Sequence, residues 1–503
     1  MIRIIVLMGL LLAFKAHAEP SGGFDSELAT NVYTTALTFM APRVVDPVPV
    51  SKLTQWGLRG LSTLDPRLTT ELHDTRLRLL NQGKSVFETG IPKDETITGW
   101  VGTIIGMTNA AISVSSTVRR TSTTGIVQSF FDALCSHLDP YSRYIPPDEA
   151  GDDRERRSGR AGIGLSLTQR DAFSVVTDVI RDSPAASAGV RPGDTIIAVD
   201  GAVMKGRNVV SVSAMIEGPE DTSLTLTWKG RDGKTRESAF VRVMVPPETV
   251  FGERAGNLLL IRIAGFNDTT DTHLAHTLQD GLAGDRPPDG IVLDLRNNRG
   301  GLLRQAVTVA DTFLPDGLVA SSVGRAPAAN HIWNSTPGEL AEGVPLVILV
   351  DGRTASAAEV LAAALADRGR AVVVGSSTVG KGLVQTITPL PDGGELYVTW
   401  SRVIAPRGWP INGLGVMPQV CTSLGDAAVQ RQLGALSEGD QPLKSAIIAH
   451  RTSRAPLAAA AIPAVRNACP AAEGRGEDLA VARSLINDRT AYATALLPPL
   501  VSP

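Results

Sequence analysis

The chain has 503 residues, a length typical of several domains rather than one. Its formal net charge of −3 gives no electrostatic argument for binding nucleic acid or an anionic membrane surface. Three cysteines allow at most one internal disulfide. Cys421 and Cys469 are the candidate pair, whereas Cys135 lies in a helical pattern of apolar neighbours and is expected to be a buried thiol.

The first 18 residues have the pattern of a secretory signal peptide. Arg3 supplies the positive start, residues 4–14 are apolar, and residues 16–18 read Ala-His-Ala, a small-x-small cleavage site. Lys15 ends the apolar run before the roughly 20 residues that a membrane span needs. We expect an exported protein, periplasmic where the source has an outer membrane, with no integral membrane segment after cleavage.

Residues 19–157 are predicted to form a mostly helical region. The mixed-sign, glycine-flanked run at 151–160 predicts a solvated connector or hinge.

The sequence Gly162-Ile163-Gly164-Leu165 opens the next region, 158–245. A glycine-flanked loop that enters a strand can leave backbone N–H groups free to bind a carboxylate, although an ordinary glycine turn has the same sequence. Residues 209–216 have a helix-like pattern and are expected to form the other wall of a groove.

An α/β pattern begins near residue 246. The sequence predicts strands at 258–263 and 290–295 and a helix at 271–282. Gly300 and Gly301 then precede a helix, where their N–H groups can face a ligand or simply form a tight turn.

Two histidines offer a competing interpretation. His273 and His276 are three residues apart on one predicted helix and could suggest a metal or a Ser-His-Asp site. We expect both to face solvent, and we expect neither a metal nor another cofactor.

The stretch from 347 to 385 contains the candidate chemistry. A buried strand at 347–350 leads to a predicted helix with Thr354 as N-cap and Ser356 near its start, and a second strand at 371–374 leads to Lys381. If both strands are parallel neighbours, Ser356 and Lys381 lie at the same sheet edge. A buried neutral lysine can activate a serine, but a helix start and a solvated loop fit the same residues.

The motifs of this stretch resemble those of the carboxyl-terminal processing peptidases, which are Ser/Lys proteases with a PDZ domain. The family blocks S-A-S-A-S-E and K-G-x-x-Q correspond to residues 354–359 and 381–385, and D-L-R-x-N-x-G-G corresponds to 294–301, with Arg299 where proline is usual. Residues 183–201 resemble the PDZ pattern of these proteases, and the resemblance covers roughly residues 125–420.

The resemblance implies a role for each matching position. It makes Ser356 the nucleophile, Lys381 the general base and Gln385 the partner of the lysine. It implies an oxyanion hole from the Ala357 N–H together with that of Gly300 or, less surely, Gly301. It also implies that the loop Gly162, Ile163, Gly164 and Leu165 binds a peptide carboxylate.

The predicted fold is a multidomain α/β protein. It comprises a signal peptide (1–18), a mostly helical region (19–157), a PDZ domain (158–245), a Ser/Lys protease core (246–425) and an extension of unassigned role (426–503). The predicted function is an exported serine endopeptidase that cuts proteins near their C-termini after the PDZ domain captures the terminal carboxylate.

Two other functions fit the same architecture. One is a catalytically silent PDZ-containing adaptor that binds peptides, and the other is a binding protein for apolar small molecules, which would have no use for Lys381 and Gln385. The expected partners are protein or peptide substrates, not nucleic acid. The sequence leaves an activating adaptor and a homo-oligomer open.

Overall fold

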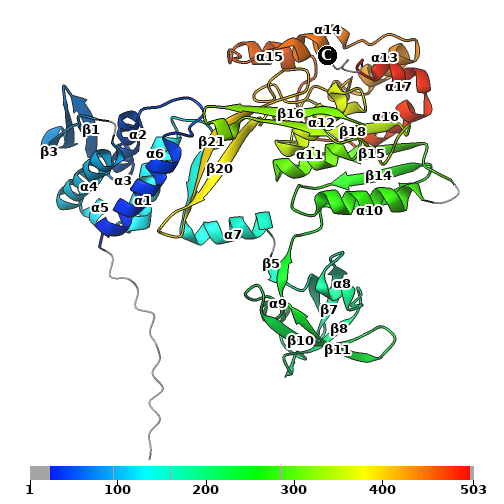
Figure 1. The fold of residues 1–503 in the computed structure, drawn as a ribbon, viewed down its shortest axis with the longest axis horizontal. Coiled ribbons are helices and arrows are strands. Elements are labelled where there is room, and N and C mark those ends of the chain that lie inside the picture. The colour runs from blue at the N-terminus through cyan, green and yellow to red at the C-terminus, as the bar shows by residue number, and fades with distance from the viewer. Residues whose placement is uncertain (1–22, 95, 159, 284–285, 499–503) are drawn as a thin grey trace, which may run out of the picture. The chain divides into compact units, whose positions relative to one another are not determined.

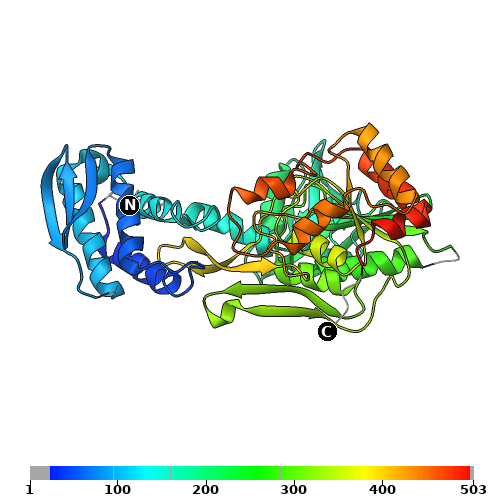
Figure 2. The ribbon, with the colours of Figure 1, turned by 90° about the horizontal axis from the view of Figure 1, so that it is seen from above.

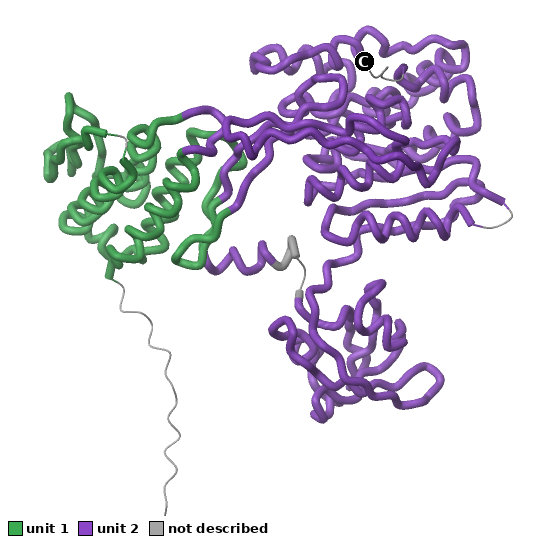
Figure 3. Tube along the Cα trace, in the orientation of Figure 1, with its two compact units in different colours: residues 1–41, 48–146, 388–396 green, residues 42–47, 147–387, 397–503 purple. Residues whose placement is uncertain are grey.

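The computed structural model describes residues 23–94, 96–158, 160–283 and 286–498. The predicted signal peptide lies outside these residues. The chain forms two compact units, which Figure 3 colours separately. The first unit contains residues 1–41, 48–146 and 388–396, and the second contains residues 42–47, 147–387 and 397–503.

The first unit combines helices with a small sheet that the sequence analysis missed. Its elements are α1 (Ser26–Met40), α2 (Val50–Leu58), α3 (Gly60–Leu64), β1 (Leu68–His73), β2 (Arg76–Asn81), β3 (Lys84–Gly90), α4 (Ile97–Val114), α5 (Ser116–Arg120), α6 (Thr123–Cys135) and β4 (Arg143–Ile145). The region is mostly helical, as predicted, and the antiparallel sheet β1–β2–β3 is an addition to that prediction. Its signal was present in β2, where buried Leu77 and Leu79 alternate with arginines in the period of two that a half-buried strand requires.

Helix α4 is long and apolar enough, by length and composition, to cross a membrane. The sequence analysis did not single out this stretch, and its expectation of no integral membrane segment after cleavage stays a prediction. The same composition fits a core helix, because seven α4 side chains are buried within the first unit, Trp100, Ile104 and Met107 among them.

Residues 147–158 form the helix α7 (Pro147–Ser158) and not the predicted connector. Proline at the first helical position has the right φ without needing a hydrogen-bond partner for its nitrogen. Asp148 and Glu149 in the first turn complement the helix dipole. These local signals outweigh the mixed-sign charges that suggested a loop.

The PDZ region is a β-sheet domain with two helices. Its elements are β5 (Arg160–Gly162), β6 (Leu165–Arg170), β7 (Phe173–Val179), α8 (Pro184–Ser187), β8 (Thr195–Val199), β9 (Ala202–Val203), α9 (Val209–Ile216), β10 (Ser223–Lys229), β11 (Thr235–Val241) and β12 (Val243–Val245). The main sheet has the order β11-β10-β8-β7-β6, and β5 pairs with β12 in a separate ribbon. A buried apolar core that includes Ile196, Leu226 and Trp228 holds the domain together.

The α/β core is built on a sheet with the order β13-β14-β15-β18-β19-β22. Its strands are β13 (Val250–Ala255), β14 (Leu258–Ile263), β15 (Gly290–Asp294), β18 (Leu346–Val350), β19 (Val372–Gly375) and β22 (Val420–Cys421). Only β13 is antiparallel to its neighbour. A second sheet has the order β17-β16-β21-β20 and comprises β16 (Gly317–Gly324), β17 (His331–Ser335), β20 (Leu383–Pro389) and β21 (Glu395–Ile404), with the short 3-10 helix η1 (Pro327–Ala329) between β16 and β17.

Both faces of the parallel sheet are covered by helices, as its nearly continuous apolar strands require. Alternate residues such as Ile348 and Val350 pack in one cluster with α10 (Thr270–Leu282), α11 (Leu303–Asp311) and α12 (Ala357–Asp367). Val347 and Leu349 pack in another cluster with helices of the C-terminal extension. The extension comprises α13 (Asp426–Ser437), α14 (Lys444–Thr452), α15 (Ala461–Arg466), α16 (Glu477–Asn487) and α17 (Arg489–Ala495) (Figures 1 and 2).

The cysteine predictions are confirmed. Cys421 at the end of β22 forms a disulfide with Cys469 in the extension. Cys135 is a buried free thiol in α6, and burial raises its pKa to about 12. The extension is therefore joined covalently to the sheet that carries the candidate site.

Candidate active site

The candidate site lies at the carboxyl ends of three neighbouring parallel strands. Gly300, Ser356 and Lys381 follow β15, β18 and β19, respectively. In the sheet register, Val350 of β18 pairs with Gly375 of β19. Parallel strands deliver their following loops to one edge, so the structure brings the predicted residues to the same side of the sheet, as the sequence analysis expected.

Ser356 ends the loop after β18 and caps α12. The prediction of Thr354 as N-cap is wrong, because the helix begins at Ala357. Thr354 is fully buried, and its hydroxyl donates to the Leu295 backbone oxygen at 2.9 Å and accepts the Asp351 N–H at 3.0 Å. Ser356 itself has a φ of 58° and a ψ of −122°. A non-glycine residue in such a conformation costs about 1–3 kcal/mol, and such strain clusters at functional sites.

One buried carboxylate joins the serine loop to the lysine loop. Glu359, in the first turn of α12, is 0 % exposed. Its Oε2 accepts the backbone N–H of Ser356 at 2.7 Å and that of Lys381 at 2.8 Å. Its Oε1 accepts the Gly380 N–H at 2.6 Å and the Thr378 hydroxyl. The two candidate catalytic residues are thus held by their main chains on a single oxygen atom.

The sequence analysis quoted Glu359 within its motif but assigned it no role. Burial raises the pKa of this carboxyl, while the hydrogen bonds that it accepts oppose the shift. The available signal was the capping-box spacing, in which a glutamate three residues after an N-cap serine reaches back to the N-cap N–H. That spacing predicts the bond to Ser356. The bonds to the lysine loop depend on the tertiary structure.

Lys381 is half-buried in the loop between β19 and β20. Gln385 lies on β20, and its Nε2 donates to the Leu383 backbone oxygen and to the Thr399 hydroxyl, both at 3.1 Å. These bonds fix the plane of the Gln385 amide. The predicted contact between this amide and the lysine amine stays a prediction.

The backbone around Gly300 approaches the start of α12 very closely. A Cβ on Gly300, whose φ is 95°, would lie 2.8 Å from the Ser356 Cβ and 2.9 Å from the Ala357 nitrogen, so only glycine fits here. The Gly300 N–H, however, donates to Asn298 Oδ1 at 2.8 Å. Because the Gly300 N–H is already bonded, the alternative prediction is preferred, in which the N–H groups of Gly301 and Ala357 form the oxyanion hole.

The histidine prediction needs a correction. His273 is buried, with 3 % of its surface exposed, and its Nδ1 lies 2.8 Å from the Glu248 carboxylate. His276 is partly buried. The carboxylate partner was missed because Glu248 precedes the strand pair β13–β14, 25 residues before the histidine. The expected solvent exposure is therefore wrong for His273. The histidine pairs with Glu248, and both residues are far along the chain from the serine and lysine loops.

The PDZ loop connects the β5–β12 ribbon to the edge of the main PDZ sheet. The backbone oxygens of Ile163 and Gly164 accept the N–H groups of Ala185 and Ile180 at 2.9 and 3.0 Å. Gly164 has a φ of 82°, and a Cβ there would lie 2.3 Å from the Ser183 Cβ. The loop is therefore fixed by glycine geometry and by bonds to the domain.

An edge strand and a helix lie next to each other after this loop. Gly162 is buried in the ribbon, and Leu165 begins β6, the terminal strand in the order of the main sheet. Helix α9 contacts β6, and its Val210 side chain is 74 % exposed. An edge strand beside a helix is the geometry in which a peptide can add as a further strand. The side chain of Ile163 belongs to the domain core, so its contribution to such a site comes from its backbone.

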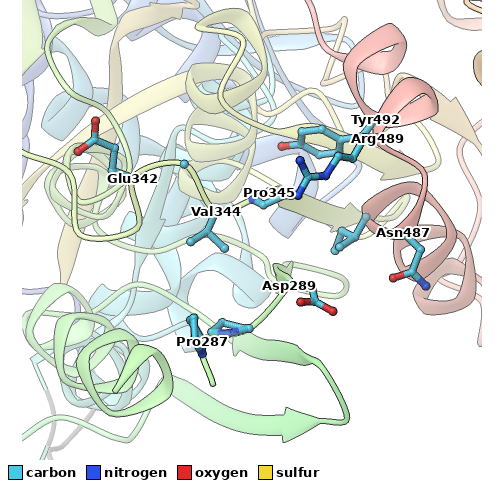
Figure 4. Close-up of a pocket in the computed structure, with 11 residues that line it drawn as sticks. Pro287, Asp289, Glu342, Val344, Pro345, Asn487, Arg489 and Tyr492 are labelled. Carbon is cyan, nitrogen blue, oxygen red and sulfur yellow. The ribbon is translucent and has the colours of Figure 1, made fainter. Parts of the chain in front are cut away.

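A separate pocket of about 730 Å³ lies at the opposite end of the sheet (Figure 4). Its lining includes Asp289 and Pro345, which directly precede β15 and β18, and Arg489 and Tyr492 from the extension. The candidate catalytic loops follow the carboxyl ends of the same strands. The pocket therefore has no part in the candidate site.

Comparisons with known proteins identify two regions of the chain. The model of peptidase family S41 matches residues 257–422, and a PDZ-domain model matches residues 175–230. The carboxy-terminal-processing protease of Bartonella bacilliformis is 34% identical over 301 residues, which cover 59% of this chain and 69% of the relative. The carboxyl-terminal-processing protease of Synechocystis is 30% identical over 351 residues, which cover 66% of this chain and 80% of the relative.

Among solved structures, the photosystem II D1 C-terminal processing protease is 26% identical, with 73% of this chain and 92% of that chain covered and a TM-score of 0.36. The family match covers the α/β region in which the serine and lysine loops meet. The PDZ match covers most of the domain that precedes it. The chain therefore belongs to the carboxy-terminal processing proteases of peptidase family S41, serine peptidases, and carries a PDZ domain ahead of its peptidase region.

Proposed function

We propose that the protein is an exported endopeptidase that cuts proteins near their C-termini, with Ser356 as nucleophile and Lys381 as general base. The observation that carries this proposal is the shared Glu359 oxygen, which accepts the backbone N–H groups of both residues within 2.8 Å. Two residues fixed this closely by their main chains can act as one catalytic unit.

Acylation begins when the Ser356 hydroxyl oxygen attacks the carbonyl carbon of the scissile peptide bond. Its proton passes to the neutral amine of Lys381, and the carbonyl oxygen becomes an oxyanion that the N–H groups of Gly301 and Ala357 stabilise. The C–N bond then breaks, and Lys381 returns the proton to the leaving amine. The N-terminal part of the substrate remains attached to Ser356 as an ester.

Deacylation repeats the same proton transfers with water. Lys381 accepts a proton from water as the water oxygen attacks the ester carbonyl. The C–O bond breaks, Ser356 recovers its proton from the lysine, and the shortened protein leaves with a new C-terminal carboxylate. Gln385 is proposed to orient the lysine amine, which is consistent with its fixed amide plane.

The PDZ domain is proposed to select substrates by their C-termini. The peptide would add beside β6, and the N–H groups of the loop Gly162–Leu165 would bind the terminal carboxylate. The partly exposed apolar surface of α9 favours an apolar terminal residue. Export is supported by the signal-like N-terminus and by the Cys421–Cys469 disulfide, which requires an oxidising compartment to persist.

The test combines labelling with product mapping. The purified mature protein is incubated with a serine-reactive fluorophosphonate and, separately, with an exported proteome whose new C-termini are identified by mass spectrometry. We expect a label on Ser356, new C-termini close to the original ones, and neither result with Ser356→Ala. A folded wild-type protein that takes no label and cuts no substrate would instead favour the catalytically silent adaptor.

A further inference from the structure

A short part of the C-terminal extension lies against both candidate catalytic loops. The peptidase model ends at residue 422, so this part falls beyond the matched family region. We define residues 466–474 as the brace. It begins at the last residue of α15, contains the disulfide cysteine Cys469, and ends before α16.

Arg466 holds the lysine loop from the side of the extension. Its guanidinium donates to the backbone oxygen of Thr378 at 2.6 Å and contacts that of Val379 at 3.5 Å. It also donates to the backbone oxygens of Gly413 and Leu414 at 3.1 and 2.8 Å. A single cation thus gathers four carbonyl groups from two irregular loops, one of which leads directly into Gly380 and Lys381.

These carbonyl groups would be poorly satisfied without the arginine. Arg466 is partly buried, and the planar guanidinium can address several acceptors at once because its donors point in fixed directions. The two loops also bind each other, since the Gly413 N–H donates to the Gly380 oxygen at 2.9 Å. Removal of the guanidinium would leave converging carbonyl dipoles beside the residues whose N–H groups bind Glu359.

The end of the brace binds the serine loop and the lysine loop together. The Ala472 backbone oxygen accepts the Gly352 N–H at 2.6 Å, and the Ala472 N–H donates to the Ser376 hydroxyl at 3.0 Å. The Gly474 N–H donates to the Asp351 carboxylate at 3.2 Å. Gly352 and Asp351 precede Ser356, and Ser376 precedes Lys381. The brace is therefore a second connection between the two loops, in addition to the one through Glu359.

We propose that the brace positions Ser356 and Lys381 for catalysis, with Arg466 as its central positioning residue. The disulfide between Cys469 and Cys421 fixes the middle of the brace to the end of β22. The inference rests on the proposed roles of the serine and the lysine. It assigns a function to part of an extension in which the sequence shows no motif.

The test compares Arg466→Ala with Arg466→Lys and with the matched control Arg483→Ala. Arg483 is another partly buried arginine of the extension, and it donates to the Ala255 backbone oxygen at 3.2 Å, at the outer strand β13. We expect Arg466→Ala to lower kcat at least tenfold with KM within twofold of wild type. We expect Arg466→Lys to recover part of kcat and Arg483→Ala to keep it. Equal kcat values for Arg466→Ala and Arg483→Ala would overturn the proposal.

Hydrogen exchange gives a readout that does not depend on cleavage. In Arg466→Ala the amides of Gly380 and Lys381, which donate to Glu359, should exchange at least tenfold faster than in wild type. Unchanged exchange would refute the brace even if the wild-type protein had no measurable activity, whereas absent wild-type activity would refute the proposed function alone.

A milder variant covers the case in which Arg466→Ala does not fold. Ser376→Ala removes only the hydroxyl that binds the brace at Ala472. We expect at least a threefold lower kcat with an unchanged KM. A kcat equal to wild type would then count against the proposal.

Discussion

Substitution of Glu359 separates its positioning role from its contribution to stability. The carboxylate accepts four hydrogen bonds, and a hydrogen bond to a charged group contributes about 1.5–3 kcal/mol. In Glu359→Gln the amide oxygen can still accept the N–H groups of Ser356 and Lys381, and the amide NH₂ can donate to the Thr378 hydroxyl. The bond from Gly380 is lost. We therefore expect a loss of about 1.5–3 kcal/mol in the free energy of unfolding for this variant.

Glu359→Ala leaves all four donors without their acceptor. Each unsatisfied buried donor costs about 1–3 kcal/mol, so the expected loss is at least about 4 kcal/mol. At about 2–4 °C per kcal/mol for a domain of 150–250 residues, Glu359→Gln should melt roughly 3–12 °C below wild type and Glu359→Ala lower still. A catalytic group displaced by 1 Å can cost about 100-fold in rate. We expect kcat to fall about tenfold in Glu359→Gln and about 100-fold or more in Glu359→Ala.

The assay measures kcat and KM on a peptide substrate beside a thermal melt, with Asp367→Asn as the control. Asp367 ends the same helix, is equally buried and forms a 2.8 Å ion pair with Arg451, but it lies 11 residues from Ser356. We expect this control to lose stability while keeping kcat. A folded Glu359→Ala variant with kcat within twofold of wild type would refute the positioning role, as would an equal loss of kcat in the control.

Three further predictions concern the base, the PDZ loop and a buried histidine. Lys381→Arg should be inactive, because a guanidinium does not lose its proton at neutral or mildly alkaline pH. Wild-type kcat/KM should rise with pH as the lysine amine becomes neutral. Activity of the folded arginine variant would contradict the role of Lys381 as base. Peptides with a free C-terminal carboxylate should be cut faster than C-terminally amidated ones, and equal rates would exclude carboxylate capture by the loop Gly162–Leu165. Burial lowers the pKa of His450 well below its usual value, and the neighbouring Arg451, from which its Nδ1 accepts, lowers it further, while the bond that its Nε2 donates to the Gly415 oxygen opposes the shift. The unfolded chain therefore binds more protons, so the stability of the folded protein should fall as pH drops below about 6.5. Between pH 7 and pH 5 the melting temperature of His450→Gln should fall less than that of wild type. The same fall in both proteins would show that the histidine is not the cause.

The sequence by itself determined the elements whose signals are local. Apolar β-branched runs predicted the buried strands β14, β15, β18 and β19, because a strand covered on both faces needs apolar residues throughout. The same order of strands and helices implied that Ser356 and Lys381 meet at one sheet edge. Two local signals were misjudged: the alternation in β2 was overlooked, and the charged run at 151–160 was taken for a connector because the helix-start residues before it were overlooked.

Only the tertiary structure decided which polar groups meet across long stretches of chain. Arg466 reaches the Thr378 oxygen over 88 residues, and Glu248 reaches His273 over 25. The Gly300 N–H, by contrast, donates to Asn298, only two residues away, in the turn before α11. Periodicity and capping encode the state of each segment, but the partner of a side chain depends on how the sheet and its loops pack. For this reason the sequence could propose the serine and the lysine, while the bonds from Glu359 to the lysine loop and the contacts of the brace became visible only in the folded chain.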